Sequence, residues 1–412
     1  MPRILHFADA HIDMANYGQH DPTTGLPERV MDFLKSLDTI VKTAIDEKVD
    51  MVIFAGDTYR DRSPQPTFQR EWGRRIMKLS QAGIPTLLVT GNHDISPAQM
   101  RAHAMQEFET LEPPFIHVLS APKLYGPDEL DGTQVQVIAL PWITRSAVVA
   151  QAQNNERAAD DPSVTIESIL TAIVEDAISR LDPELPTILT AHASVAGAKF
   201  GNEQTIKIGK DVILQPAFVC NPRFDYVALG HIHKYQDLNE GGYPPVIYPG
   251  SIERVDFGEI NEDKGFVIAD VQKGKTTYER RVLATRRFID LKARLEEGDD
   301  VMEKIMSTLP PAEDAAGAIV RMTLDYPKDL ETHIDEKQLR ERMKNAFEFF
   351  LVKNSRTQAR SRLDVNDATA SMPPIELMNL YWKEHNFSEE SRETLGWLAN
   401  RIISDVSGGV DD

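Results

Sequence analysis

The sequence predicts an α/β protein in which sheets flanked by helices form a layered main domain. A smaller α+β domain and a C-terminal pair of helices are expected to follow. Three observations support this prediction. Up to about residue 270, short apolar or β-branched runs alternate with helical patterns, which is typical of α/β layers. After Gly274 the alternation is lost, and a polar stretch then precedes two short helical patterns.

The first 270 residues contain strand-sized runs and two clear amphipathic helices. In residues 28–48 and 165–181, apolar side chains recur at the i, i+3, i+4, i+7 spacing that gives one apolar helix face. Each strand candidate is a short run of β-branched or apolar residues. The candidates are 3–8, 51–55, 86–90, 135–140, 187–191, 225–229, 245–248 and 265–271.

Beyond residue 272 the chain is predicted to hold a small capping domain, a linker and a helical pair. In the capping domain, strand-like runs at 276–283 and 318–324 precede a helical pattern at 335–350. The linker is polar, and the last helix is expected to begin after Ser388, because serine favours helix N-termini. The predicted boundaries of the four parts are 1–272, 273–352, 353–372 and 373–406.

Length and composition limit the class of protein. The 412 residues suffice for two or three domains, and 41% hydrophobic with 26% charged residues is typical of globular chains. The longest apolar runs are strand-sized, so no membrane span is expected. Met1 leads directly into a strand-like run, so no signal peptide is expected, and the expected location is the cytoplasm. The single cysteine, Cys220, excludes an internal disulfide and is expected to be a buried apolar residue.

Five strand candidates end in side chains that commonly bind metal ions. In open α/β sheets, ligands bind beyond the carboxyl ends of the strands, so these ends are expected to meet at one site. Residues two apart, such as His231 and His233, point to the same side of an extended backbone. Gly56, Gly91 and Gly230 allow sharp turns close to a metal. The candidate ligands are Asp9, His11, Asp57, Asn92, His192, His231 and His233.

The types of ligand indicate the metal. Carboxylate, amide oxygen and imidazole without thiolate suit Mn²⁺, with Fe²⁺ or Zn²⁺ as alternatives. Seven ligands are too many for one four-coordinate ion and fit two divalent ions bridged by a carboxylate. A single aspartate after a strand is usually a turn former, but five such strand ends would rarely arise for structural reasons. The isolated His6 and His117 are expected to be packed or surface histidines.

In the order of these motifs, the chain resembles the calcineurin-like metallophosphoesterase superfamily. The motifs are D-x-H at Asp9, GD at Asp57, GNHD at 91–94, H at His192 and GHxH at 230–233. The resemblance covers about residues 1–265. It implies that the main domain is a metallophosphoesterase sandwich.

The resemblance also implies roles for single residues. Asp57 would bridge the two ions, which together would activate water for attack on phosphorus. His93 would stabilise charge or protonate the leaving oxygen, and Asp94 would orient its imidazole, with turn support as the alternative for both. One ion would be bound by Asp9, His11, Asp57 and His233, and the other by Asp57, Asn92, His192 and His231.

The metal motifs leave two substrate classes open: DNA, or the small molecules and proteins used by free-standing phosphatases and cyclic-nucleotide phosphodiesterases. The order of the domains and the runs 5–11, 248–254 and 264–266 resemble the SbcD family of double-strand-break repair nucleases. That resemblance implies a Mn²⁺-dependent 3′→5′ exonuclease and single-strand endonuclease that processes DNA ends. It also implies an SbcC-type ABC-like coiled-coil ATPase as partner and a homodimer within a heterotetramer.

The net charge of −19 argues against a free-standing nucleic-acid binder, but basic residues are concentrated in two stretches. Residues 273–294 contain eight basic and two acidic side chains, and residues 353–362 contain four basic and no acidic ones. Both stretches suit phosphate contacts, with a solvated strand or helix face as the alternative. Arg60 stands where archaeal and eukaryotic relatives usually have histidine, which favours the bacterial branch. The DNA-binding candidates are Arg60, Arg254, Arg280, Arg281, Arg286 and Arg287.

Each of the last two predicted helices carries an apolar stripe. Two short helices cannot bury both stripes against each other, so they are expected to dock on other helices. The polar linker and the aromatic content favour the partner ATPase over the body of this chain. The candidates are Ile375, Met378, Tyr381, Trp382, Leu395, Leu398, Ile402 and Val406.

Overall fold

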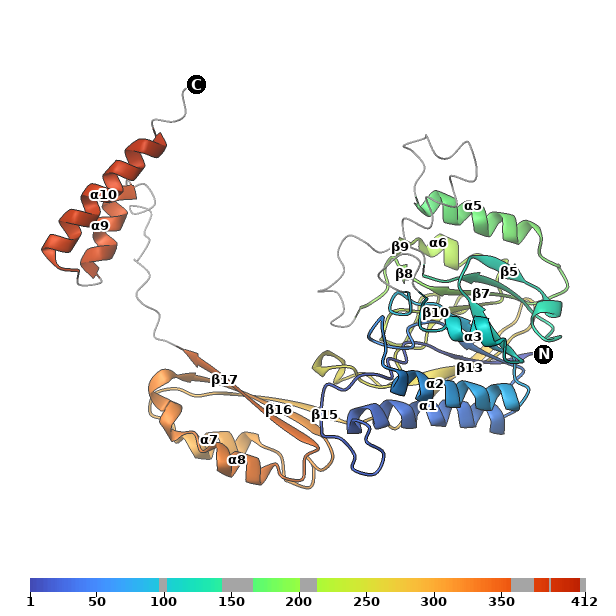
Figure 1. Cartoon of the computed structure of the whole chain (residues 1–412), viewed down its shortest axis with the longest axis horizontal. Coiled ribbons are helices and arrows are strands. Elements are labelled where there is room, and N and C mark those ends of the chain that lie inside the picture. The colour runs from blue at the N-terminus through green and yellow to red at the C-terminus, as the bar shows by residue number, and fades with distance from the viewer. Residues whose placement is uncertain (96–101, 143–165, 201–212, 357–373, 385–386, 408–412) are drawn as a thin grey trace. The chain divides into compact units, whose positions relative to one another are not determined.

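The computed structural model describes residues 1–95, 102–142, 166–200, 213–356, 374–384 and 387–407 (Figure 1). Its main part contains two six-stranded sheets. In the first sheet four neighbouring strands, β1 to β4, are parallel, and two antiparallel strands, β13 and β14, follow β1 at one edge. The order is β14 (Thr277–Val282), β13 (Gly265–Asp270), β1 (Arg3–Phe7), β2 (Met51–Phe54), β3 (Thr86–Val89) and β4 (Ile116–Leu119).

The second sheet has four parallel central strands and an antiparallel strand at each edge. All eight predicted strands are found in the two sheets, with ends that differ by one residue at most. The order is β11 (Gln236–Asp237), β12 (Val246–Tyr248), β10 (Tyr226–Gly230), β7 (Thr187–His192), β6 (Gln136–Leu140) and β5 (Lys123–Tyr125).

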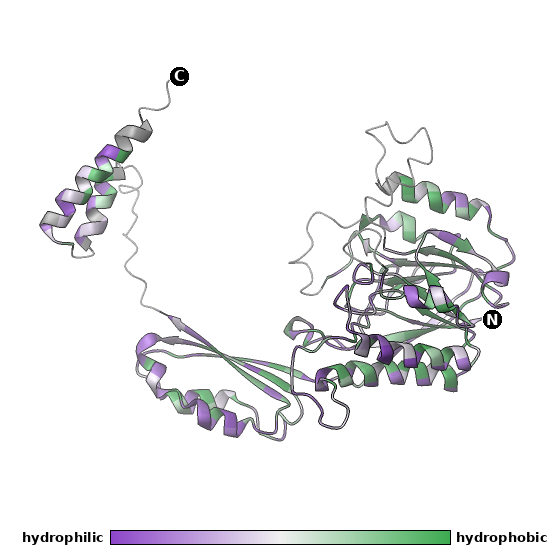
Figure 2. Cartoon of the chain, viewed as in Figure 1, coloured by the Kyte–Doolittle hydropathy of each residue, from purple (hydrophilic) through white to green (hydrophobic). Residues whose placement is uncertain are grey.

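The sheets stack in layers because alternate side chains of each strand face opposite sides. Leu5 of β1 packs with α1 (Glu28–Asp46) and α2 (Pro66–Gln81), whereas Ile4 packs with Val137 of the second sheet. On its other face the second sheet packs against α5 (Ile166–Ser179) and α6 (Pro216–Val219). Figure 2 shows mainly apolar strands and helices with both apolar and polar residues. The predicted layered α/β fold and the helices predicted at 28–48 and 165–181 are confirmed.

Two elements differ from the prediction. The strand predicted at 276–283 forms as β14, but it pairs with β13 at the edge of the first sheet rather than in a second domain. The helix predicted at 335–350 is limited to α8 (Glu336–Arg342), and β17 (Glu348–Arg356) follows it. Phe349, Phe350 and Val352 explain the strand, since aromatic and β-branched residues favour extended backbone. The predicted linker begins inside β17, and its remainder lies outside the described residues.

The chain divides into two compact units. One comprises Met1–Asp290, Pro310–Arg321 and Arg340–Phe350, and the other Leu291–Leu309, Met322–Leu339 and Leu351–Asp412. A three-stranded sheet has the order β15 (Phe288–Arg294), β16 (Ile319–Pro327), β17, which confirms the strand predicted at 318–324. The remaining short elements are α3 (Gln106–Leu111), α7 (Val301–Thr308), β8 (Ser194–Val195), β9 (Ile213–Leu214), η1 (Pro127–Glu129), η3 (Phe257–Glu259) and η4 (Lys328–His333).

The predicted helical pair is present as α9 (Pro374–Glu384) and α10 (Glu389–Ser407), which contact each other. Ser388 begins α10 as predicted, because its Oγ accepts a hydrogen bond from the backbone N–H of Ser391 at 3.3 Å. Cys220, expected to be buried, is half-buried. Among the helices of the described residues, none is long and apolar enough to cross a membrane.

Candidate metal centre

The seven predicted ligands meet where strands of the two sheets end. Asp9, Asp57 and Asn92 follow β1, β2 and β3 of the first sheet, and His192 and His231 lie at the ends of β7 and β10 of the second. All seven side chains are buried. The edge formed by the carboxyl ends of the strands therefore brings together residues from across 225 positions of sequence, as predicted.

Close packing at these strand ends explains the glycines in the motifs. A Cβ atom at Gly56 would lie 2.3 Å from Nδ1 of His192, and one at Gly91 would lie 2.2 Å from Oδ1 of Asp57. The ligands themselves have unusual backbone angles: φ is 51° at Asp9 and 63° at Asp57. L-residues seldom adopt positive φ, and such strain often marks functional sites.

One cluster consists of Asp9, His11 and His233. Their ligand atoms all lie within 4.8 Å of one another. The Nε2 atoms of His11 and His233 face each other at 3.1 Å. Two imidazole nitrogens that converge in this way suit an ion held between them.

The second cluster consists of Asp57, His192 and His231, whose ligand atoms also lie within 4.8 Å of one another. Oδ1 of Asn92 lies 3.1 Å from Nε2 of His192 and 3.0 Å from Nδ1 of His231, so the amide oxygen faces the same point. Oδ2 of Asp57 lies 3.4 Å from Nε2 of His192 and 3.9 Å from Nε2 of His11. Asp57 therefore stands between the two clusters, where a bridging carboxylate is needed.

The electrostatics of the centre call for added positive charge. Burial raises the pKa of the Asp9 carboxyl to about 7, although the nearby histidines lower it. Burial would lower the pKa of His192, but the charge of Asp57 raises it to about 9. Nearby cations stabilise buried carboxylates as anions, and divalent ions would supply that positive charge. Both the donor atoms and the charge balance thus fit two divalent ions.

In three of the four ligand imidazoles, those of His11, His192 and His233, the nitrogen that points away from the centre makes a contact that fixes the orientation of the ring. Nδ1 of His11 lies 3.2 Å from the carbonyl oxygen of Tyr59, and Nδ1 of His192 lies 2.7 Å from that of Ala55. A carbonyl oxygen only accepts, so Nδ1 donates in both and Nε2 is directed to the centre. His233 instead donates from Nδ1 to Oε1 of Glu259, at 2.8 Å.

His93 and Asp94 lie beside the centre but interact differently from what was expected. Nδ1 of His93 lies 2.7 Å from the carbonyl oxygen of Arg60, so a backbone carbonyl orients the imidazole. The buried carboxylate of Asp94 accepts hydrogen bonds from the backbone N–H groups of Asp57, Thr58 and Gly91 at 2.8, 2.9 and 2.8 Å. The expectation that Asp94 orients His93 is thus corrected, because its acceptor positions hold the two ligand-bearing loops together.

The predicted DNA-binding arginines fall into two groups. Arg254 donates to Thr285 Oγ1 and to the carbonyl oxygen of Arg286, and Arg286 forms a bidentate pair with Asp32 at 2.5 and 2.7 Å. These two side chains therefore stabilise the fold through internal contacts, which differ from both the expected phosphate contacts and the alternative of a solvated face. Arg60 and Arg287 are exposed, whereas Arg280 and Arg281 are half-buried beside Tyr235 and Glu47.

The residues predicted to bind a partner show a similar division. Met378, Tyr381, Leu398 and Ile402 are exposed at 39%, 46%, 42% and 61%. Trp382 is buried, so this residue is part of the interior and not of an exposed stripe. Ile375 and Leu395 are half-buried, and Val406 lies among residues whose side chains are not described. Four of the seven candidates whose side chains are described are therefore exposed.

Sequence reasoning missed three residues at the centre: Trp142, Glu259 and Lys264. The ring of Trp142 lies 5.2 Å from that of His231, and Glu259 contacts His233. Lys264 belongs to a run noted for its resemblance to a known family, but its contact with Glu259 had no visible signal in the sequence. His6 is packed as predicted, between Tyr226 and the carbonyl oxygen of Leu229.

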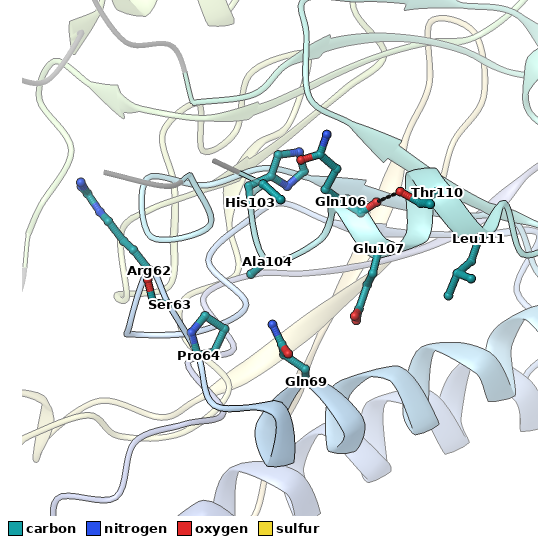
Figure 3. A pocket seen from close by; sticks show the side chains of 11 residues that line it. Arg62, Ser63, Pro64, Gln69, His103, Ala104, Gln106, Glu107, Thr110 and Leu111 are labelled. Carbon is teal, nitrogen blue, oxygen red and sulfur yellow. Dashed lines mark hydrogen bonds between the residues drawn. The ribbon is translucent and has the colours of Figure 1, made fainter. Parts of the chain in front are cut away.

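An open hollow of about 910 Å³ lies next to the loop that carries Arg60 (Figure 3). Its wall includes Arg62, Gln69, His103 and Glu107, and its lining is polar and apolar in similar measure. The same loop contacts the imidazole of His93 through its backbone. The residues that line the hollow include neither His93 nor any of the seven predicted ligands.

Comparison with known proteins identifies the family. The family model described as calcineurin-like phosphoesterase matches residues 2–235. The SbcD component of the SbcCD nuclease from Staphylococcus epidermidis is 26% identical over 306 residues, which is 72% of each chain. The SbcD component of the same nuclease in Escherichia coli K12 is 28% identical over 289 residues, 66% of each chain. An uncharacterized metallophosphoesterase of Bacillus subtilis, YhaO, is 25% identical over 67% of this chain and 59% of its own.

The matched segment covers more than half of the chain and includes the predicted ligands as far as His233. It contains β1 to β4 of the first sheet, β5, β6, β7 and β10 of the second, and both buried clusters. The chain belongs to the calcineurin-like phosphoesterase family, and it is a metallophosphoesterase, a hydrolase of phosphoester bonds.

Proposed function

We propose that this chain is a Mn²⁺-dependent DNA nuclease that cleaves phosphodiester bonds while processing DNA ends. The observation that carries the proposal is the pair of buried clusters joined by Asp57, in a chain similar over two thirds of its length to the SbcD components of SbcCD nucleases. The proposed activities are 3′→5′ exonuclease on duplex ends and endonuclease on single strands.

In the proposed mechanism, Asp9, His11 and His233 would hold one ion and Asn92, His192 and His231 the other, and Asp57 would contribute to both. The ions would supply Lewis acidity that activates water and neutralises phosphate charge. His93 would stabilise the charge on the phosphate or give a proton to the leaving oxygen. Because Nδ1 of His93 donates to the carbonyl of Arg60, its Nε2 would face the substrate.

DNA is proposed as the substrate because the chain is similar to the SbcD components of SbcCD nucleases. The hollow beside Arg62 has room for a nucleotide, and the exposed Arg60 could contact a phosphate. A phosphoesterase for small molecules or proteins is the competing proposal. The net charge of −19 and the internal contacts of Arg254 and Arg286 favour that alternative.

We further propose that α9 and α10 bind an SbcC-type ATPase, and that two copies of this chain act in a heterotetramer with it. Met378, Tyr381 and Ile402 present apolar surface that the pair does not bury. Exposed aromatic and aliphatic side chains on helices are typical of surfaces that dock on other helices.

A direct comparison of substrates tests the choice of DNA. The full-length protein would be incubated with Mn²⁺ and end-labelled duplex DNA, single-stranded DNA, p-nitrophenyl phosphate or cyclic nucleotides, with and without the ATPase. We expect cleavage of both DNAs, and no cleavage by the Asp57→Asn variant. The outcome that would contradict the proposal is rapid hydrolysis of p-nitrophenyl phosphate or cyclic nucleotides while DNA stays intact in every reaction. It would favour the competing class of substrates, small molecules or proteins.

The proposed docking surface is tested separately. Met378→Asp combined with Ile402→Asp should abolish co-purification with the ATPase while nuclease activity of the isolated chain is unchanged. Lys383→Glu provides a control on the same pair of helices that alters an exposed charge instead of the apolar surface. Unchanged co-purification of the double variant would exclude this surface.

A further inference from the structure

The imidazole of His233 is held by a buried carboxylate, unlike those of His11 and His192. Oε1 of Glu259 accepts the Nδ1–H of His233 at 2.8 Å, and both side chains are buried. His11 and His192 donate to backbone carbonyls instead. A carboxylate is a stronger acceptor than a neutral carbonyl, so it makes the opposite nitrogen of the imidazole a better donor to a metal.

The chain builds a specific support for this carboxylate. Oε2 of Glu259 accepts the backbone N–H of Val255 at 2.8 Å and lies 3.0 Å from Nζ of Lys264. The Lys264 side chain is fully buried, and its Nζ also donates to the carbonyl oxygen of His233 at 3.0 Å. Lys264 thus contacts both the backbone of the ligand and the carboxylate that orients its side chain.

Local backbone structure brings Glu259 to this position. Glu259 ends the short helix η3, whose first turn is held by Asp256, because Oδ1 of Asp256 accepts the N–H of Gly258 at 2.6 Å. Gly250 has a φ of 79°, and a Cβ atom there would lie 2.6 Å from the carbonyl oxygen of His233. The segment after β12 therefore packs directly against the backbone of the ligand.

We propose that Glu259, held by Lys264, is the positioning residue for the His233 ligand and strengthens binding of the ion shared by Asp9, His11 and His233. A buried lysine is costly to maintain, so its place behind a metal ligand is difficult to explain by stability alone. Glu259 fixes the tautomer of His233, directs Nε2 to Nε2 of His11, and raises its strength as a donor. The contacts described above for Glu259 and Lys264 are with His233, Val255 and each other.

This inference rests on the proposed two-metal centre but not on the choice of DNA as substrate. It is therefore tested by titrating the full-length protein with Mn²⁺. The electron paramagnetic resonance signal of the free ion measures how much Mn²⁺ remains unbound at each step. Metal content after desalting gives the stoichiometry. Neither measurement requires a substrate, so a failed nuclease assay would leave the result interpretable.

The Glu259→Ala variant should bind one of its two Mn²⁺ ions about 10–100-fold more weakly and the other with unchanged affinity. Glu259→Gln, which keeps an acceptor oxygen but removes the charge, should show a smaller loss of the same ion. In a His233→Ala background, Glu259→Ala should have no further effect on Mn²⁺ binding, because the residue acts through His233.

Glu262→Gln is the matched control. Glu262 lies 2.9 Å from the same lysine, yet its carboxylate contacts Lys264 and not the imidazole, so both affinities should be retained. If circular dichroism shows that the Glu259→Ala variant does not fold, the Mn²⁺ affinities of the Glu259→Gln variant test the proposal instead. Two ions bound with unchanged affinity in the folded variant, or an equal loss in Glu262→Gln, would overturn the proposal.

Discussion

The compact unit that contains the two six-stranded sheets (the main unit) has two largely buried groups of charged side chains, and they differ in how their charges are balanced. In one, Arg29 pairs with Glu253 at 3.3 Å and with Asp32 at 2.9 Å, and Arg286 also pairs with Asp32. In the metal centre, Asp9 and Asp57 face histidines, which are neutral when they bind metal. The first group supplies its own counter-charges, whereas the second needs charge from outside the chain.

The difference separates a structural cluster from a functional one. A balanced buried network holds elements together and needs no ligand, although its assembly is costly in desolvation. A buried group that lacks cations must take up protons or metal, and burial raising the pKa of Asp9 to about 7 reflects that need. Charge balance thus distinguishes the two groups.

The largest effect is expected for His93→Ala, which changes the chemistry of the centre without changing its charge balance. Hydrolysis should fall by about 10²–10⁴-fold, as for the loss of a general acid, while two ions remain bound. Activity with Mn²⁺ and the metal content of the purified variant would be measured together. His117→Ala, which alters a histidine paired with Asp131 at the surface, should retain full activity. Loss of an ion from the His93 variant would make His93 a ligand.

The next effect concerns the balanced network. Arg29→Met should destabilise the main unit by about 3–5 kcal/mol, because Glu253 would remain buried without its cation. Urea denaturation followed by circular dichroism would give the free energy of unfolding. Lys42→Met removes an exposed pair with Asp46 on the same helix and should cause no measurable change. A loss in the Arg29 variant as small as in that control would show that the network is unimportant for stability.

Mn²⁺ itself should stabilise only the group that lacks cations. At free Mn²⁺ a hundredfold above the dissociation constant, each occupied site should add about 2.7 kcal/mol to the free energy of unfolding. The Arg29→Met variant should have a lower free energy of unfolding, but Mn²⁺ should raise it by the same amount, since the charges of the network and of the centre are balanced separately. Thermal denaturation with Mn²⁺ or with a chelator would measure both. An increment that disappears in Arg29→Met would mean that the two groups are coupled.

The smallest effect, over the single pH unit in which it would be measured, concerns His6, a buried histidine that stays neutral. Burial lowers its pKa from 6.5 to about 3, although the carbonyl of Leu229 raises it slightly. The folded state thus binds this proton less readily than the unfolded state. Its contribution to stability is full above pH 6.5 and is lost as the pH falls toward 3, by about 1.4 kcal/mol per pH unit. His6→Gln should show a correspondingly weaker loss between about pH 6.5 and 5.5, and an unchanged pH dependence would contradict it.

The sequence predicted the centre better than its surroundings. Asp9, Asp57 and His231 could be recognised because ligand-type residues at strand ends have few structural explanations. Glu259 could not, because its partner is 26 residues away and the contact depends on a turn set by a single capping bond. The role of Arg286 was also not predictable, since a guanidinium binds a phosphate and an internal carboxylate equally well.

The sheets show a similar limit. The periodicity of 28–48 and the apolar runs predicted the type and place of each main element, because burial determines both. The partner of β14 was not predictable, since the residues of an edge strand do not encode which neighbouring strand it will pair with. The length of the helix predicted at 335–350 was overestimated because helical spacing continued into residues that extend in the three-stranded sheet.

The facing Nε2 atoms of His11 and His233 are separated by 222 residues along the chain. An ion between them would close a loop of that length, and the entropy of loop closure grows with the logarithm of the number of residues. The ion would thus restrict the unfolded chain as a long-range cross-link does, besides serving the reaction. Both sheets must be assembled before it can bind, so capture of the metal reports that the N-terminal and C-terminal halves of the main unit have joined.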